Sequence, residues 1–312
     1  MIEYDAKQWT SHLFDIRGSM VHAIFGRIVV CVLWSGLVLV SHEVILYKYK
    51  VDRITIPTTI HTLVGFALGT LLVFRTNSSY DRFWEGRKFW GGIVNECRNL
   101  GRQGTVLFRN DPELLRSMLL WTMAWPHAAM HSLRGANELG PSGTSLPPAE
   151  VVAAINSAHP PSYVATMITA KLVEGRDKGY ISDIMLQHLD QNVQLLIDYI
   201  GGCERIKKTP LPFAYMVHIR RALMLYCFTL PFALVNDFGE GAIVATFLVA
   251  YIFFGIEEIG VEIENPFDGD ENDIPLEKIC GTIDNNLAAL LPPAAVATIE
   301  APAPRREAIS AG

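Results

Sequence analysis

The stretch Ile54-Thr-Ile-Pro-Thr-Thr-Ile-His-Thr-Leu-Val-Gly-Phe-Ala-Leu-Gly-Thr-Leu-Leu-Val-Phe74 is an uncharged run between Arg53 and Arg75. At about 1.5 Å per residue, a helix of this length crosses the ~30 Å hydrocarbon core of a bilayer. Arginine, tryptophan and tyrosine residues follow the run, as is typical where a helix leaves hydrocarbon for the head-group layer. The stretch therefore predicts a membrane-spanning helix.

Threonine and glycine residues interrupt this apolar run at close intervals, so lipid is not its only expected neighbour. In a helix, Phe66, Thr70 and Phe74 fall on one stripe, because residues four apart lie on the same face. Gly65 and Gly69 form a ridge of small residues that allows another helix to approach closely. The pattern leaves two interpretations open, ordinary packing between helices or a stripe that faces water in a pore.

Three further apolar runs are predicted to lie in the membrane, at residues 28–47, 222–236 and 241–256. The last two are short for a span and are joined by Asp237–Glu240, which predicts a helical hairpin. A buried hairpin in a soluble helical protein is the alternative, but it does not account for the two earlier runs. The predicted fold class is an all-α membrane protein with four membrane-associated helical segments and a helical cytosolic region.

Positively charged residues place the polar helices on the cytosolic side of the membrane. Lysines and arginines are frequent in residues 75–221, which include a predicted helix over 147–170. Residues 257–287 begin with an acidic segment and complete the cytosolic region. The Ala/Pro-rich tail 288–312 is predicted to be mobile, which leaves residues 1–287 as a single unit.

The composition excludes several classes of protein. A net charge of -6 and the absence of a basic cluster away from the apolar runs give no reason to expect a nucleic-acid partner. The five cysteines are scattered without a Cys-x-x-Cys pair, which favours reduced thiols over a disulfide framework. The first residues mix charges and have no apolar core, so no cleaved signal peptide is expected.

No common catalytic signature is present, and the sequence predicts a protein that is not an enzyme. It contains no Gly-x-Gly-x-x-Gly, Walker loop, Gly-x-Ser-x-Gly or His-Glu-x-x-His motif. His127 and His131 are four residues apart on one helix face and could share a metal ion, but two ligands do not make a site. Hydrogen-bonded histidines that pack between helices are the alternative.

The acidic segment imitates part of a calcium loop. Asp268, Asp270 and Asn272 occupy the first three ligand positions of an EF-hand. Asp273 stands where the turn glycine belongs and Ile279 where the closing glutamate belongs, so an EF-hand is excluded. An irregular cluster of Asp268, Asp270 and Asp273 that binds a divalent cation such as calcium stays as an alternative to a solvated run of charges. No other cofactor is expected.

Three stretches of the sequence resemble segments of the bacterial branch of the bestrophin family. The first resembles the family's second-helix signature, the second its segment before the third span, and the third its acidic segment after the fourth span. The matches run in order from about residue 8 to residue 288. They are Gly65–Gly91 with Phe-Arg-Thr-Asn-Ser-Ser-Tyr-Asp-Arg-Phe-Trp, Gly202–Tyr215 with Lys-Lys-Thr-Pro-Leu-Pro-Phe, and Glu262–Leu276 with Glu-Asn-Pro-Phe-Asp-Gly-Asp.

The resemblance implies a homopentameric channel in a lipid bilayer, the bacterial inner membrane, with both termini in the cytosol. Each subunit would place its second helix around one central pore, through which monovalent ions pass passively. Carried over by position, the family's neck corresponds to Phe66, Thr70 and Phe74, and its cytosolic constriction corresponds to Ile184. Thr70 departs from the bulkier apolar residue expected at that ring, and its hydroxyl would hold water more readily.

The resemblance leaves the sign of the permeant ion open, because animal bestrophins resemble chloride channels whereas some bacterial members resemble channels for Na⁺ or K⁺. Asp183, beside the constriction, would place a ring of carboxylates near the axis, and such rings favour cations. Arg75 would favour anions if it faces the lumen, and otherwise would contact lipid phosphate. A carrier for a small anion and a non-conducting membrane scaffold are the alternative functions, which ion flux distinguishes from a channel.

Overall fold

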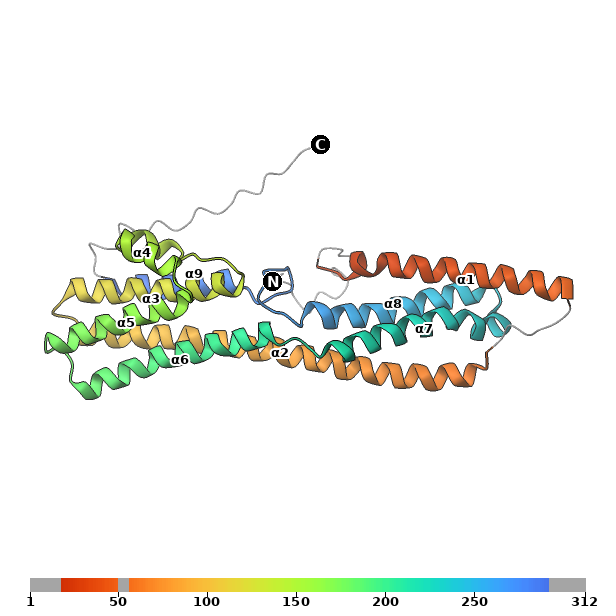
Figure 1. Cartoon of the computed structure of the whole chain (residues 1–312), viewed down its shortest axis with the longest axis horizontal. Helices are drawn as coiled ribbons and strands as arrows, with labels where there is room; N and C mark the ends of the chain where they lie inside the picture. The colour runs from red at the N-terminus through yellow and green to blue at the C-terminus, as the bar shows by residue number, and fades with distance from the viewer. Residues whose placement is uncertain (1–17, 50–55, 292–312) are drawn as a thin grey trace, which may run out of the picture. The chain divides into compact units, whose positions relative to one another are not determined.

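The computed structural model describes residues 18–49 and 56–291, and helices dominate them (Figure 1). No β-strand occurs in those two ranges, which confirms the predicted all-α class. In chain order the elements are α1 (Val21–Tyr49), α2 (Thr58–Leu107), α3 (Pro112–Leu133), the 3-10 helix η1 (Pro141–Ser145), α4 (Pro148–Ile155), α5 (Pro160–Asp177), α6 (Asp183–Lys208), α7 (Phe213–Phe238), α8 (Gly241–Glu262) and α9 (Leu276–Ala288).

The helices group into two compact units, and α2 contributes residues to both. The first unit contains α1, α7, α8 and the beginning of α2, and comprises residues 1–84, 209–266 and 270–273. The second unit contains the rest of α2 with α3, η1, α4, α5, α6 and α9, and comprises residues 85–208, 267–269 and 274–312. The predicted unit of residues 1–287 contains parts of both, and its boundaries stay a prediction.

Four helices of the described chain, α1, α2, α7 and α8, are long and apolar enough to cross a membrane. Each contains one of the predicted apolar runs, although residues 54 and 55 of the second run lie outside the described residues. Helices α7 and α8 are longer than the runs 222–236 and 241–256, since α7 begins at Phe213 and α8 ends at Glu262. Hydropathy marks where the hydrocarbon ends, whereas helical hydrogen bonding continues through polar residues.

The beginning of α2 joins the core of the first unit. Helix α8 packs against α1 and α7, and α1 also contacts α7. Gly65 allows close approach to α7, because a Cβ atom at this position would lie 2.7 Å from the hydroxyl oxygen of Tyr226. A Cβ atom at Gly69 would meet no neighbour within 4 Å, so only the first glycine of the predicted ridge packs tightly. The buried core includes Ile28, Leu68, Leu72, Ile219, Leu223 and Phe254.

The predicted helix over 147–170 is wrong, because the chain forms two helices there. Helix α4 ends at Ile155 and α5 begins at Pro160. Pro160 and Pro161 restrict the backbone before them and cannot donate hydrogen bonds, so they suit only the first turn of a new helix. His159 caps that turn, since its Nδ1 accepts the backbone N–H of Ser162 at 3.1 Å.

Helix α3 is the centre of the second unit and contacts α5, α6, α9 and η1. Trp121 and Trp125 are fully buried in it, although the sequence around them was interpreted as part of a polar region. Asp111 caps α3 by accepting the backbone N–H of Leu114 at 3.0 Å, and it also accepts from Lys178 at 2.9 Å. These two contacts, that of Leu114 first, hold the pKa of Asp111 below its usual value.

Gly202→Ala is expected to destabilise the second unit by about 1–3 kcal/mol, the usual cost of adding a methyl group to a packed core. The new Cβ atom would lie 2.5 Å from a ring carbon of Phe89, whose ring packs beside Tyr199 at a centroid distance of 6.1 Å. Thermal unfolding of the purified protein measures the effect. Gly201→Ala is the control, because a Cβ atom there meets no neighbour within 4 Å. Equal unfolding midpoints for the two variants would contradict this packing.

Candidate ion-conduction site

The three residues predicted to form the neck lie on one exposed stripe of α2. In the single subunit, Phe66 is 80% exposed and Phe74 is 62% exposed, and Thr70 between them is also exposed. Leu68 and Leu72 lie on the opposite, buried face. One face of helix α2 thus packs into its own subunit, and the opposite face is exposed on the surface of that subunit.

The hydroxyl of Thr70 is partly occupied by its own helix. Its Oγ1 donates to the carbonyl oxygen of Phe66 at 2.9 Å. The proton is therefore used within the helix, and only the oxygen lone pairs stay available to water. This geometry makes Thr70 a weaker water-binding group than a hydroxyl with a free proton, and it moderates the expected effect of a threonine in an apolar neck.

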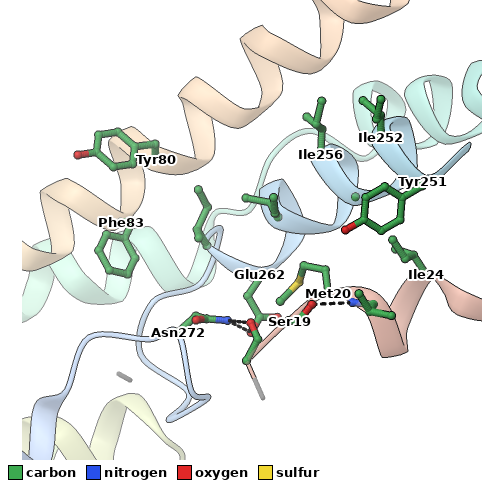
Figure 2. Close-up of a pocket in the computed structure, with 15 residues that line it drawn as sticks. Ser19, Met20, Ile24, Tyr80, Phe83, Tyr251, Ile252, Ile256, Glu262 and Asn272 are labelled. Carbon is green, nitrogen blue, oxygen red and sulfur yellow. Dashed lines mark hydrogen bonds between the residues drawn. The ribbon is translucent and has the colours of Figure 1, made fainter. Parts of the chain in front are cut away.

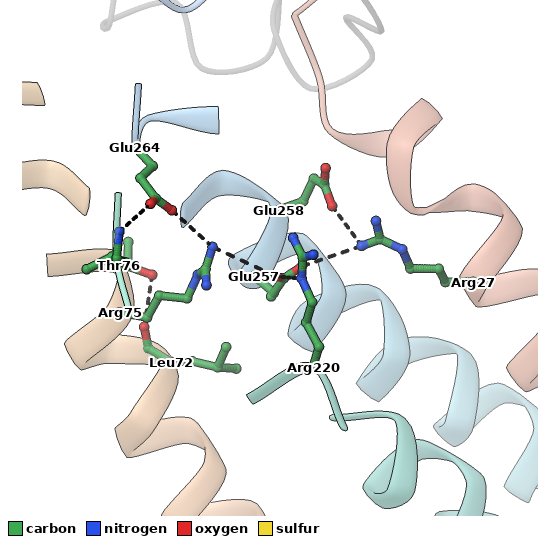
Figure 3. Close-up of polar contacts among 9 residues, drawn as sticks. Arg27, Leu72, Arg75, Thr76, Arg220, Glu257, Glu258 and Glu264 are labelled. Atoms are coloured by element: carbon green, nitrogen blue, oxygen red, sulfur yellow. Dashed lines mark hydrogen bonds and ion pairs between the residues drawn. The ribbon is translucent and has the colours of Figure 1, made fainter. Parts of the chain in front are cut away.

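Arg75 follows Phe74 directly but points into the subunit. Its side chain is 0% exposed, with Nη2 lying 3.6 Å from Glu264 Oε2 and 3.9 Å from Glu257 Oε1 (Figure 3). Both interpretations of this arginine from the sequence, a charge in the lumen or a contact with lipid phosphate, are therefore wrong for the described subunit. The uncharged run placed Arg75 at the end of the span, but it contained no information about the partners of this side chain in distant parts of the sequence.

One buried carboxylate contacts arginine side chains from three different helices. Glu257 of α8 is 1% exposed and accepts from Arg220 Nε of α7 at 2.9 Å. Arg27 of α1 lies 3.4 Å from Glu257 and 2.7 Å from Glu258. Figure 3 shows the three arginine side chains converging on Glu257. We call this set the arginine–glutamate cluster; its members are Arg27, Arg75, Arg220, Glu257, Glu258 and Glu264.

The arginine–glutamate cluster was missed in the sequence, although a signal for it existed. Ionisable residues at the end of an apolar span are costly unless they pair, so Glu257 and Glu258 required positive partners on neighbouring helices. Arg27, Arg75 and Arg220 all lie at the ends of predicted spans. The cluster contains three arginines and three glutamates, so its formal charges balance.

The predicted cytosolic constriction lies in the second unit, at the beginning of α6. Ile184 is 69% exposed and the side chain of Asp183 is 86% exposed. Arg176 of α5 lies 3.5 Å from Asp183 and 2.8 Å from Asp177. These carboxylates, that of Asp177 first, raise the pKa of Arg176. The negative charge of Asp183 is therefore partly compensated by a guanidinium of the same subunit.

Part of the acidic segment is bound by basic residues of the second unit. Arg134 donates through Nε to the carbonyl oxygen of Phe267 at 3.0 Å. It also donates to Glu277, which holds the pKa of that carboxyl below its usual value. Lys207 donates to Asp268 at 2.8 Å. Asp268 thus has a protein cation as its partner.

Of the other two predicted metal ligands, the Asp273 carboxylate is used within a turn of the first unit, whereas Asp270 contributes its backbone N–H to that turn and its side chain is exposed. Asp273 accepts the backbone N–H of Asp270 at 3.0 Å and is 2% exposed. Among residues 18–49 and 56–291, no three His, Cys, Asp or Glu side chains come close enough to hold a metal ion. The structure therefore does not supply the predicted calcium cluster of Asp268, Asp270 and Asp273.

The histidine pair of α3 contacts carboxylates. His127 Nε2 lies 2.8 Å from Asp284 Oδ2, and His131 Nε2 lies 3.7 Å from Glu138 Oε2. Burial lowers the pKa of His131. Both histidines belong to packing contacts of the second unit, as the alternative interpretation of the sequence had it.

A cavity of about 730 Å³ opens in the first unit beside α8 (Figure 2). Its walls are mainly apolar and come from α1, α2 and α8, with Tyr80, Phe83, Ile252 and Ile256 among them. Its polar end includes Glu262, which accepts from Asn272 at 3.4 Å. No lysine or arginine among residues 18–49 and 56–291 lines this cavity.

Comparisons with known proteins agree with this architecture. A voltage-dependent anion channel-forming protein of Nostoc sp. is 38% identical over 285 residues, which is 90% of this chain and 91% of that protein. The voltage-dependent anion channel-forming protein YneE of Escherichia coli K12 is 28% identical over 287 residues, covering 92% of this chain and 93% of that protein. A crystal structure of a bacterial bestrophin homolog from Klebsiella pneumoniae superimposes with a TM-score of 0.80 at 28% identity, covering 86% of this chain and 99% of that one.

These relatives are named as channel-forming proteins, which confirms that the chain is of a channel class and is not an enzyme. The four apolar helices and the matched structures make it an integral membrane protein. The model of the bacterial and fungal bestrophin proteins matches residues 1–289. The chain belongs to the bacterial and fungal bestrophin family.

Proposed function

We propose that the chain forms a passive channel for monovalent ions, with its neck at Phe66, Thr70 and Phe74. The exposed stripe of α2 is the observation that supports this proposal, because the opposite face of the helix is already packed into the subunit. Rings of apolar side chains empty a narrow pore of water, so ion flow depends on wetting and on the ring diameter. The neck needs no charge, which agrees with Arg75 pointing away from the stripe.

The proposed assembly is a homopentamer in the bacterial inner membrane with both termini in the cytosol. One helix stripe cannot enclose a path for ions, so several copies must surround an axis, and a closed ring of identical contacts does this. The number five rests on the resemblance to the family. The orientation rests on the arginines and lysines that follow the second span, since positive charge favours the cytosolic side.

The ion carried is proposed to be an anion, with chloride as the simplest case. The names of the Nostoc and Escherichia coli relatives describe anion channels, and this is the support for the choice. A cation channel is the second candidate, because the carboxylate of Asp183 is 86% exposed beside Ile184. Arg176, at 3.5 Å, weakens that ring charge.

The reversal potential of the purified protein in planar bilayers tests the proposal. Under a tenfold NaCl gradient, a perfectly selective channel reverses at about 59 mV, with a sign that identifies the ion. Reversal near the chloride potential is expected. Reversal near the sodium potential would replace the anion by a cation and direct attention to Asp183. Silence would favour a scaffold, and saturable exchange of a small anion without channel currents would favour a carrier.

A further inference from the structure

The exposed stripe and the arginine–glutamate cluster meet at one peptide bond of α2. Phe74 is 62% exposed, whereas the next residue, Arg75, is 0% exposed. None of the three guanidinium nitrogens of Arg75 has a hydrogen-bond partner in the described chain, and its two ion pairs are long, at 3.6 and 3.9 Å. A buried guanidinium without hydrogen bonds is held mainly by electrostatic attraction, so its position depends on where the neighbouring carboxylates lie.

The backbone of α8 is adapted to this side chain. A Cβ atom at Gly260 would lie 3.1 Å from Arg75 Nε, closer than most real contacts. Glycine at this position therefore leaves room for the guanidinium against the α8 backbone. The contact fixes the turn of α2 that contains Phe74 at a set distance from α8.

Glu264 connects the same turn to a further part of the first unit. One of its oxygens pairs with Arg75, and the other accepts the backbone N–H of Leu211 at 2.8 Å. Leu211 lies just before α7, and Glu264 lies just after α8. Arg75 thus joins α2 to the two segments that border the α7–α8 hairpin.

We propose that Arg75 is a positioning residue of the neck, which holds the Phe74 turn of α2 through Glu257 and Glu264. The inference rests on the proposed function, because it needs Phe74 to face the pore. An apolar neck conducts only above a threshold diameter, so the mean current rises steeply with diameter. A turn that is held less firmly samples wider diameters more often, and the channel is then open for a larger fraction of the time.

Single-channel recordings of Arg75→Gln test the proposal. The open probability is expected to rise at least about fivefold, the lower end of typical coupling between sites, while the unitary conductance stays near that of the wild type. Arg75→Lys keeps the charge and is expected to restore most of the wild-type open probability. Glu264→Gln removes the shorter ion pair and is expected to change the open probability in the same direction, even if Arg75→Gln fails to fold. In a double variant that folds, adding Glu264→Gln to Arg75→Gln is expected to change the open probability little further.

Arg220→Gln is the matched control. Arg220 pairs with the same Glu257 at 2.9 Å, closer than Arg75 does, but it lies on α7 and not beside the neck. If the cluster only stabilises the fold, Arg220→Gln will change the open probability as much as Arg75→Gln, and the proposal is overturned. Unchanged gating in both Arg75→Gln and Glu264→Gln would also overturn it.

A parallel recording of Phe74→Ala separates this inference from the proposed function. If Phe74→Ala raises the unitary conductance but the Arg75 and Glu264 variants behave as wild type, the neck stands and the positioning role fails. If Phe74→Ala leaves the conductance unchanged, the neck itself is wrong. Thermal unfolding of each variant in nanodiscs shows whether an altered current accompanies a loss of folded protein.

Discussion

Phe74→Ala is expected to raise the unitary conductance several-fold. In a symmetric ring, the substitution removes one phenyl group per subunit from the same level of the pore, so the neck widens and wets more readily. Phe66→Ala is expected to act in the same direction about two helical turns away, because Phe66, Thr70 and Phe74 share a stripe. Single-channel recording in planar bilayers gives both values under the same salt gradient.

Phe25→Ala provides the matched control for this experiment. Phe25 of α1 is 63% exposed in the single subunit, almost the same as Phe74, but it lies outside the α2 stripe. A loss of apolar area alone would affect both variants equally. Wild-type conductance in both Phe74→Ala and Phe66→Ala would refute the neck, and an equal increase in Phe25→Ala would show that the effect is not local.

Hydropathy and helical period were sufficient to predict the membrane helices and the stripe, because both depend on residues close in sequence. The four apolar runs appear as α1, α2, α7 and α8, and Phe66, Thr70 and Phe74 share an exposed face. Period alone did not distinguish a stripe that faces a pore from ordinary packing between helices. That choice depends on neighbouring subunits, which a single sequence does not describe.

The sequence indicated that Glu257 requires positive partners, but it did not identify Arg75 as one of them, because the two residues lie far apart along the chain. Pairing of Arg75 with Glu257 and Glu264 requires the α7–α8 hairpin to return beside α2, and no local pattern specifies that return. The break between α4 and α5 is different. The sequence His159-Pro160-Pro161 contained a signal for this break, because a proline disfavours helical backbone in the residue before it.

Glu257→Gln is expected to destabilise the first unit by about 3–5 kcal/mol, the usual cost of removing one partner from a buried charge network. The glutamine keeps the size of the side chain but removes the one carboxylate of the described residues that contacts Arg27, Arg75 and Arg220 together. Three positive charges would then share the two remaining carboxylates of the cluster. Thermal unfolding of the protein in nanodiscs should show a clearly lower midpoint.

Glu258→Gln is the matched control for the destabilisation expected of Glu257→Gln. Glu258 is the next residue of the same helix and pairs with Arg27 at 2.7 Å, but its side chain is 14% exposed against 1% for Glu257. Its partner Arg27 is 39% exposed, so solvent screens the pair and its loss should cost no more than about 1 kcal/mol. If the two variants unfold at the same midpoint, Glu257 is not the residue that joins the helices, and the cluster is a set of independent surface pairs.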